Sequence, residues 1–176
     1  MNQHFSTFGL PHDLLKAIRD YQSLEQKVSQ LVVSVCRPFC STCSNCCCKT
    51  DFCSEAFDSY WLEMTWKLWG YNRSQYDDSI GWLLSDGCRL AAGRPPVCYE
   101  YLCNKIIDGI PNDTLYHLKE VSMQLSSAGK KALGNRHLIT LTSEQIMTRM
   151  NIRKLRRQIT NSLHLVQKYE EEMSTF

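Results

Sequence analysis

A cysteine-rich stretch constrains this chain more than any other feature of its sequence. Seven of the ten cysteines fall between Cys36 and Cys53, and three of these are consecutive. Buried structural cysteines gain nothing from lying beside one another, so this concentration of thiols indicates chemistry at sulfur rather than packing. The ten residues are Cys36, Cys40, Cys43, Cys46, Cys47, Cys48, Cys53, Cys88, Cys98 and Cys103.

Length and composition predict one domain in a reducing compartment. A chain of 176 residues can bury one apolar core, so we expect a single domain over residues 1–176. Ten cysteines are too few for a small secreted disulfide scaffold. The first ten residues do not resemble a signal peptide, and no apolar run is long enough for a membrane helix. We therefore predict a cytoplasmic protein, in which clustered cysteines bind metal or undergo redox reactions more often than they form disulfides.

Apolar residues at three- and four-residue spacing predict helices on both sides of the cysteine-rich stretch. A stripe from Leu14 to Val35 indicates a helix over residues 13–35, which Pro38 is expected to end. The later helices are expected over residues 51–69, 74–84, 97–107, 112–128 and 142–172. The last of them has a capping box, formed by Thr142 and Gln145. Residues 129–137 are expected to form a basic loop and residues 138–141 a short extended piece.

These patterns predict an all-α fold with a helical bundle of about five helices. Residues 1–35 and 112–176 would supply the flanking bundle helices, and residues 36–103 would form a cysteine-rich metal-binding loop region near one end. Tryptophans just downstream of the first cysteines are expected either in the core or as an apolar shell around a metal centre. A formal charge of +2 gives no reason to expect a nucleic-acid or membrane partner. The flanking helices leave a protein partner open.

Thiolates are soft ligands that select zinc, copper(I) or iron–sulfur clusters. The overlapping pairs Cys40-x-x-Cys43 and Cys43-x-x-Cys46 resemble the comb of sulfurs with which ferredoxin-type chains hold a cluster. Consecutive side chains point in different directions, so the three cysteines over 46–48 are not expected to bind one ion together. Either two metal sites share the region, or some thiols do not bind metal. Disulfides remain an alternative, as does the cluster of a radical S-adenosylmethionine enzyme, although the chain lacks the strand–helix alternation of such enzymes.

Taken together, three blocks of residues resemble a known family. They are Cys40-x-x-Cys43-x-x-Cys46-Cys47, then Cys88-Arg89-Leu90, then Arg94-Pro95-x-x-Cys98 followed by Cys103. The chain is similar in these blocks to the YkgJ-type family, known as the CxxCxxCC or zinc- or iron-chelating domain, which includes flagellin lysine N-methylases. The resemblance covers residues 36–103 and implies that the metal ligands are Cys40, Cys43, Cys46, Cys47, Cys88, Cys98 and Cys103.

The chain also departs from the family pattern. Ser44 stands where the family commonly has glycine, and residues 91–93 lack the Cys-x-Ile-Tyr element that usually precedes Arg-Pro. One of Cys36, Cys48 or Cys53 could supply the missing ligand. The resemblance also implies that Arg94 and Pro95 shape the loop before Cys98, with Arg94 donating hydrogen bonds to sulfur or to a neighbouring carbonyl.

The leading interpretation is a cysteine-ligated metal-binding protein with an accessory or structural role. An iron–sulfur cluster is favoured as its cofactor and zinc comes next, and the bound metal would supply folding energy. One alternative is a small iron–sulfur-dependent enzyme that modifies a protein side chain, by analogy with the methylases. The chain has no G-x-G-x-x-G loop for a nucleotide cofactor, and we assign no catalytic residue. A metal storage or trafficking protein is a further alternative, which the surplus of thiols allows.

Overall fold

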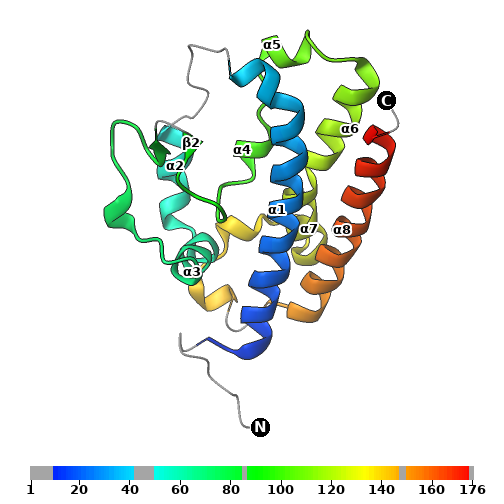
Figure 1. Cartoon of the computed structure of the whole chain (residues 1–176). Helices are drawn as coiled ribbons and strands as arrows, with labels where there is room; N and C mark the ends of the chain where they lie inside the picture. Colours follow the sequence, from blue (N-terminus) through cyan, green and yellow to red (C-terminus); the bar gives the residue numbers. More distant parts are fainter. Residues whose placement is uncertain (1–9, 42–49, 85–86, 147–149, 175–176) are drawn as a thin grey trace.

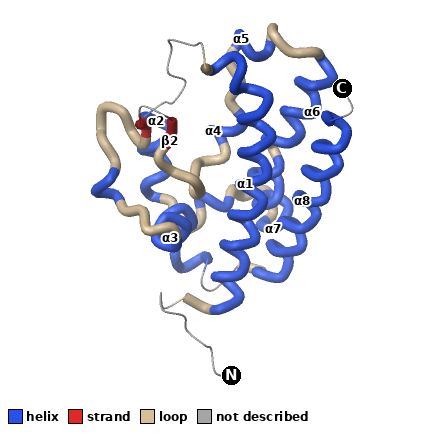
Figure 2. The backbone as a smooth tube through the Cα atoms, viewed as in Figure 1, coloured by secondary structure: helices blue, strands red, loops and turns tan. Residues whose placement is uncertain are grey.

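A computed structural model describes residues 10–41, 50–84, 87–146 and 150–174 (Figure 1). Most of these residues are helical, which confirms the all-α prediction. The strands among them are two residues long, β1 (Leu83–Leu84) and β2 (Gly87–Cys88), and they pair in antiparallel fashion (Figure 2). None of the described helices is both long enough and apolar enough to cross a membrane. Four predicted metal ligands, at positions 43, 46, 47 and 48, lie outside the described residues.

Four helices pack together as a helical bundle. They are α1 (His12–Cys40), α6 (Asn112–Ser122), α7 (Gln124–Leu133) and α8 (Ile152–Ser174), and α8 contacts the other three. Each turns an apolar stripe inward, as the sequence periodicity predicts. Fully buried members of these stripes are Ile18, Leu24, Val28, Leu118, Leu125, Leu155, Ile159 and Val166. Two ion pairs, Asp20 with Arg156 and Lys27 with Glu170, join α1 to α8.

The first helix is longer than predicted. It does not end before Pro38 but continues to Cys40, so Pro38 lies inside its last turns. A proline costs the helix one backbone hydrogen bond, which packing can offset. Here the half-buried Phe39 lies against Gly109, where an added Cβ would come within 2.4 Å of the Phe39 ring. The helix thus runs past the proline and has Cys40 at its end, with Phe39 packed against Gly109 beside it.

Residues 50–110, in the middle of the chain, are built from short elements, and we call this segment the cysteine-bearing half. The helix predicted over 51–69 is divided, because Ser59 accepts a hydrogen bond from the Leu62 amide and starts a new helix. The predictions over 74–84 and 97–107 are also wrong as single helices. The observed elements are α2 (Thr50–Glu55), η1 (Ala56–Asp58), α3 (Tyr60–Leu68), η2 (Arg73–Gln75), α4 (Val97–Glu100) and α5 (Asn104–Ile107).

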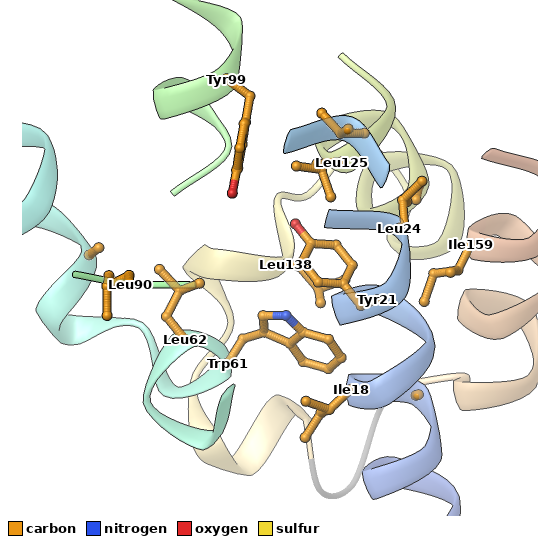
Figure 3. Packing of buried hydrophobic residues seen from close by; sticks show 14 of the residues in the cluster. Ile18, Tyr21, Leu24, Trp61, Leu62, Leu90, Tyr99, Leu125, Leu138 and Ile159 are labelled. Carbon is orange, nitrogen blue, oxygen red and sulfur yellow. The ribbon is translucent and has the colours of Figure 1, made fainter. Parts of the chain in front are cut away.

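Aromatic side chains form the core of the cysteine-bearing half. Trp61, Trp66 and Trp82 are each at most 1 % exposed, and the rings of Trp66 and Trp82 lie 5.6 Å apart. Trp61 meets Tyr21 of α1 edge to face, with ring centroids 5.6 Å apart (Figure 3). Edge-to-face pairs of this kind add to the free energy gained from burial. Trp61 therefore joins this aromatic core to the helical bundle.

The chain between α7 and α8 also differs from prediction. Gly129 lies inside α7 rather than in a loop, because the 3-10 helix η3 (Leu138–Thr140) packs closely against it. An added Cβ at Gly129 would lie 3.2 Å from the Leu138 amide nitrogen. The predicted capping box forms, since Thr142 and Gln145 exchange hydrogen bonds. However, residues 150 and 151 are not helical, so the last long helix begins at Ile152 rather than at residue 142.

Candidate functional site

The described cysteines lie on four elements and directly before a fifth. Cys36 and Cys40 are on the last turns of α1, Cys53 is on α2, Cys88 on β2, Cys98 on α4, and Cys103 directly precedes α5. Cys36 and Cys53 are buried, Cys88 and Cys103 are half-buried, and Cys40 and Cys98 are exposed. Both α4 and α5 contact α1, and Figure 1 shows the C-terminal end of α1 near α5 at the top, with α2 and β2 beside each other on the left. Contacts of α1 with α4 and α5 thus join the elements that carry Cys36, Cys40 and Cys98, and we take these elements as the region of the candidate site.

This region does not show a complete set of metal ligands in the part of the chain that the structure describes. No three cysteine, histidine or acidic side chains among residues 10–41, 50–84, 87–146 and 150–174 converge closely enough to hold a metal ion. The central ligands of the predicted site are Cys43, Cys46 and Cys47, which lie outside these ranges. The assignment of metal ligands therefore stays a prediction. The chemistry of the donors, thiols throughout, fits zinc or an iron–sulfur cluster.

Arg94 lies close to two of the predicted ligands. Burial lowers the pKa of Arg94, but the negative forms of Tyr99, Cys88, Glu25 and Cys98 together raise it above its ordinary value. Arg94 Nε donates a hydrogen bond of 2.7 Å to the Leu90 carbonyl, which confirms the predicted bond to a neighbouring carbonyl. The guanidinium lies over the Tyr99 ring, 5.9 Å from its centroid. Arg94 therefore places a positive charge near both Cys88 and Cys98.

A buried carboxylate fixes the loop that carries these residues. Glu25, on α1, is fully buried, and its Oε2 accepts a hydrogen bond of 2.8 Å from the Gly93 amide. Its Oε1 accepts two more, each 2.9 Å long, from the Arg94 amide and the Tyr99 hydroxyl. We call Glu25, Gly93, Arg94 and Tyr99 the Glu25 network. It joins α1 directly to the segment between Cys88 and Cys98.

Burial sets the protonation of the Glu25 network. Burial raises the pKa of Glu25, and the hydrogen bonds from Gly93, Arg94 and Tyr99 oppose this rise without cancelling it. The pKa of Tyr99 is raised well above its ordinary value, first by burial and then by the charge of Glu25. The Tyr99 hydroxyl therefore keeps its proton and donates a hydrogen bond to Glu25.

The same loop is also held from the side of α3. Trp66 Nε1 donates a hydrogen bond of 2.8 Å to the Gly93 carbonyl. Gly93 has φ of 81°, and an added Cβ would lie 2.7 Å from the Trp66 ring. Only glycine combines this backbone conformation with such a close contact. Gly93 is thus fixed by α1 through its amide and by α3 through its carbonyl.

Sequence reasoning missed Glu25, although its position carried a signal. Glu25 follows Tyr21 by four residues and precedes Val28 by three, so it lies within the apolar stripe of the predicted helix. An acidic residue on a buried helix face requires hydrogen-bond donors from elsewhere in the chain. The sequence alone does not identify those donors, because two of them are backbone amides nearly seventy residues away.

Comparison with known proteins adds no assignment. No family model matches the chain, and it has no significant match among curated proteins or solved structures. The resemblance to the YkgJ-type family therefore rests on the spacing of the cysteines and of Arg94-Pro95, and it stays a prediction.

Proposed function

We propose that this protein binds a metal centre through its cysteines, with an iron–sulfur cluster favoured and zinc next. Its role would be that of an accessory or structural metalloprotein, in which a cysteine-rich metal-binding loop region is attached to a helical bundle. The proposed ligands are Cys40, Cys43, Cys46, Cys47, Cys88, Cys98 and Cys103. Further candidates are Cys36, Cys48 and Cys53.

The observation that carries this proposal is the Glu25 network. Burying a carboxylate costs free energy, which its hydrogen bonds only partly offset. In this protein the buried carboxylate fixes a short loop, and Cys88 and Cys98 lie on either side of that loop. Metal ligands need positions defined to a fraction of an ångström, and residues around the ligands commonly supply that definition. A loop held this firmly between two cysteines is what a metal centre would require.

Arg94 supports the same proposal through its charge. A centre ligated by several thiolates carries net negative charge, and a nearby guanidinium stabilises it. Arg94 lies near Cys88 and Cys98 and is partly buried, so its charge is screened less by water than that of a surface arginine. When bound, an iron–sulfur cluster would supply electron transfer or structural cross-linking, and zinc would supply cross-linking alone.

The first test is metal analysis of protein purified without oxygen. Brown protein that contains iron and acid-labile sulfide would support an iron–sulfur cluster, and colourless protein with stoichiometric zinc would support a zinc site. Protein that contains neither, even after reconstitution with each metal, would contradict the proposal. Cys88→Ser and Cys98→Ser should each lower the amount of bound metal per chain.

A matched pair of variants tests the role of the Glu25 network in this site. Glu25→Gln replaces one acceptor oxygen by a donor, which opposes the donors that face it. It should make bound metal easier to remove with a chelator. Asp20→Asn is the control, because Asp20 also lies on α1 but pairs with Arg156 on α8. If the two variants retain metal equally well, the Glu25 network does not help to hold the metal.

A further inference from the structure

A cavity of about 310 Å³ lies beside the segment that leads to Cys98. Its apolar walls include Pro95, Pro96 and Val97, and Ile139 of η3 also lines it. This volume is at the lower end of the range for small-molecule sites, which are usually apolar with a few converging polar groups. The polar groups of this cavity include Glu100 on α4 and Ser126 on α7.

Glu100 gives the cavity its charge. The cavity lining also includes His137 and Thr140 but no lysine or arginine, and Glu100 forms no ion pair, with His137 or with any other residue in the described part of the chain. Its Oε1 accepts a hydrogen bond from the hydroxyl of Ser126, a residue only 8 % exposed. Its Oε2 has no hydrogen-bond partner among the described residues. The cavity therefore contains a half-buried carboxylate with one oxygen oriented by the protein and one oxygen available.

The walls of this cavity are fixed before any ligand arrives. Pro95 and Pro96 have restricted backbones, and the residue before them, Arg94, is held by its hydrogen bond to Glu25. On the other side, η3 packs against α7 at Gly129. A preformed site loses little conformational entropy when a ligand binds.

These features define the chemistry of a ligand. A carboxylate between apolar walls attracts a cation more strongly than one in open water, because the local dielectric constant is lower. A metal ion would need several strong ligands, and no three cysteine, histidine or acidic side chains of the described residues converge, in this cavity or elsewhere. An organic cation needs only one carboxylate and an apolar surface for its carbon chain.

We propose that this cavity binds a small alkylammonium ion. The ammonium group donates hydrogen bonds to Glu100, and the alkyl chain packs against Pro95, Val97 and Ile139. Ser126 orients the carboxylate but does not supply charge. This proposal does not depend on metal binding, although the cavity and the predicted metal site share the segment from Pro95 to Cys98.

The test is a titration of the folded protein with n-butylammonium, followed by amide chemical shifts in the ¹H–¹⁵N spectrum. Saturable shifts are expected at Val97, Ser126 and Ile139. The control ligand is 1-butanol, which has a similar shape and no charge, and it should bind about tenfold more weakly or worse because a charge-assisted hydrogen bond is lost. Absence of saturable shifts with n-butylammonium, or equal affinity for both ligands, would overturn the proposal.

Two variants locate the binding group. Glu100→Gln keeps an acceptor for Ser126 and the shape of the side chain, so the fold should persist, and a far-ultraviolet circular dichroism spectrum checks this. It should lower the affinity for n-butylammonium to that for 1-butanol. Asp113→Asn removes the same charge from the exposed first turn of α6 and should leave the affinity unchanged. An unchanged affinity in Glu100→Gln would place the cation elsewhere and overturn the proposal.

Discussion

The helical bundle and the cysteine-bearing half both have apolar cores, and the cysteine-bearing half adds side-chain hydrogen bonds that fix its backbone. In the bundle, apolar side chains from long helices meet, and Leu155, Ile159 and Val166 of α8 are completely buried. In the cysteine-bearing half the elements are short, and side chains hold the backbone through hydrogen bonds. Gly93 is bound by Glu25 and by Trp66, and the Ala91 amide donates to the Tyr71 hydroxyl.

Apolar burial and hydrogen bonds give a protein different properties: burial mainly stabilises the fold, and hydrogen bonds fix the positions of backbone atoms. Apolar burial is strong but tolerates small shifts, because one well-packed arrangement can relax into another. Hydrogen bonds contribute less net free energy, yet they require particular distances and angles. Apolar burial in both halves can therefore supply free energy of folding, while hydrogen bonds in the cysteine-bearing half keep a defined backbone between Cys88 and Cys98. The two halves should respond differently to substitution.

The largest effect is expected from a substitution in the bundle core. Leu155→Ala should lower the free energy of unfolding by about 2–5 kcal/mol, because it leaves a cavity among fully buried side chains. Urea denaturation followed by circular dichroism measures this change. The matched control is Leu165→Ala on the same helix, where the side chain is 36 % exposed and the cost should be within about 0.5 kcal/mol. Similar costs at both positions would mean that α8 does not pack as described.

A smaller and more local effect is expected at Glu25. Glu25→Gln should lower the free energy of unfolding by about 1.5–3 kcal/mol, because hydrogen bonds to a buried charged group are lost. The readout that separates this from a bundle defect is amide hydrogen exchange. The amides of Gly93 and Arg94 should exchange faster in the variant, while α8 keeps its protection. Faster exchange spread evenly over both halves would contradict the separation between them.

The smallest effect is expected in how the contribution of Glu25 to the free energy of unfolding changes with pH. The pKa of Glu25 is raised in the folded state, so the folded protein binds the proton more tightly than the unfolded chain does. The stability gained in this way is fully present below the unfolded pKa of about 4.3 and is lost as pH rises through the folded pKa. The difference in unfolding free energy between the native protein and Glu25→Gln should therefore shrink as pH increases from about 4. A difference that grows with pH would show that the hydrogen bonds outweigh burial.

The bundle could be predicted from the sequence because its apolar stripes repeat with the helical period. Errors arose where contacts between distant segments override local signals. Pro38 lies inside α1, where Phe39 packs on Gly109, and Gly129 lies inside α7, where Leu138 packs against it. Ser59 divides a predicted helix because its side chain caps the start of α3. Serine is a common N-cap residue, but a serine in the sequence does not require a helix to begin there.

The candidate site was predictable only in its residue types. The spacing of the cysteines and of Arg94-Pro95 predicts a site over residues 88–103, which stays a prediction, and the charges of Cys88 and Cys98 contribute to raising the pKa of Arg94. Glu25 escaped prediction because its donors belong to a loop far along the chain. Local periodicity describes one helix at a time, and hydrogen bonds between remote segments leave no trace in it.

The pairing of α1 with α8 has a consequence for the time course of synthesis. These two helices pack against each other, yet α8 begins more than a hundred residues after α1 ends. At typical rates of chain elongation, roughly five to twenty seconds pass between the emergence of the two. During that interval the apolar side of α1 lacks the helix that covers it, while the cysteine-rich stretch has already left the ribosome. The thiols of this stretch and an uncovered face of α1 are thus exposed together in the nascent chain.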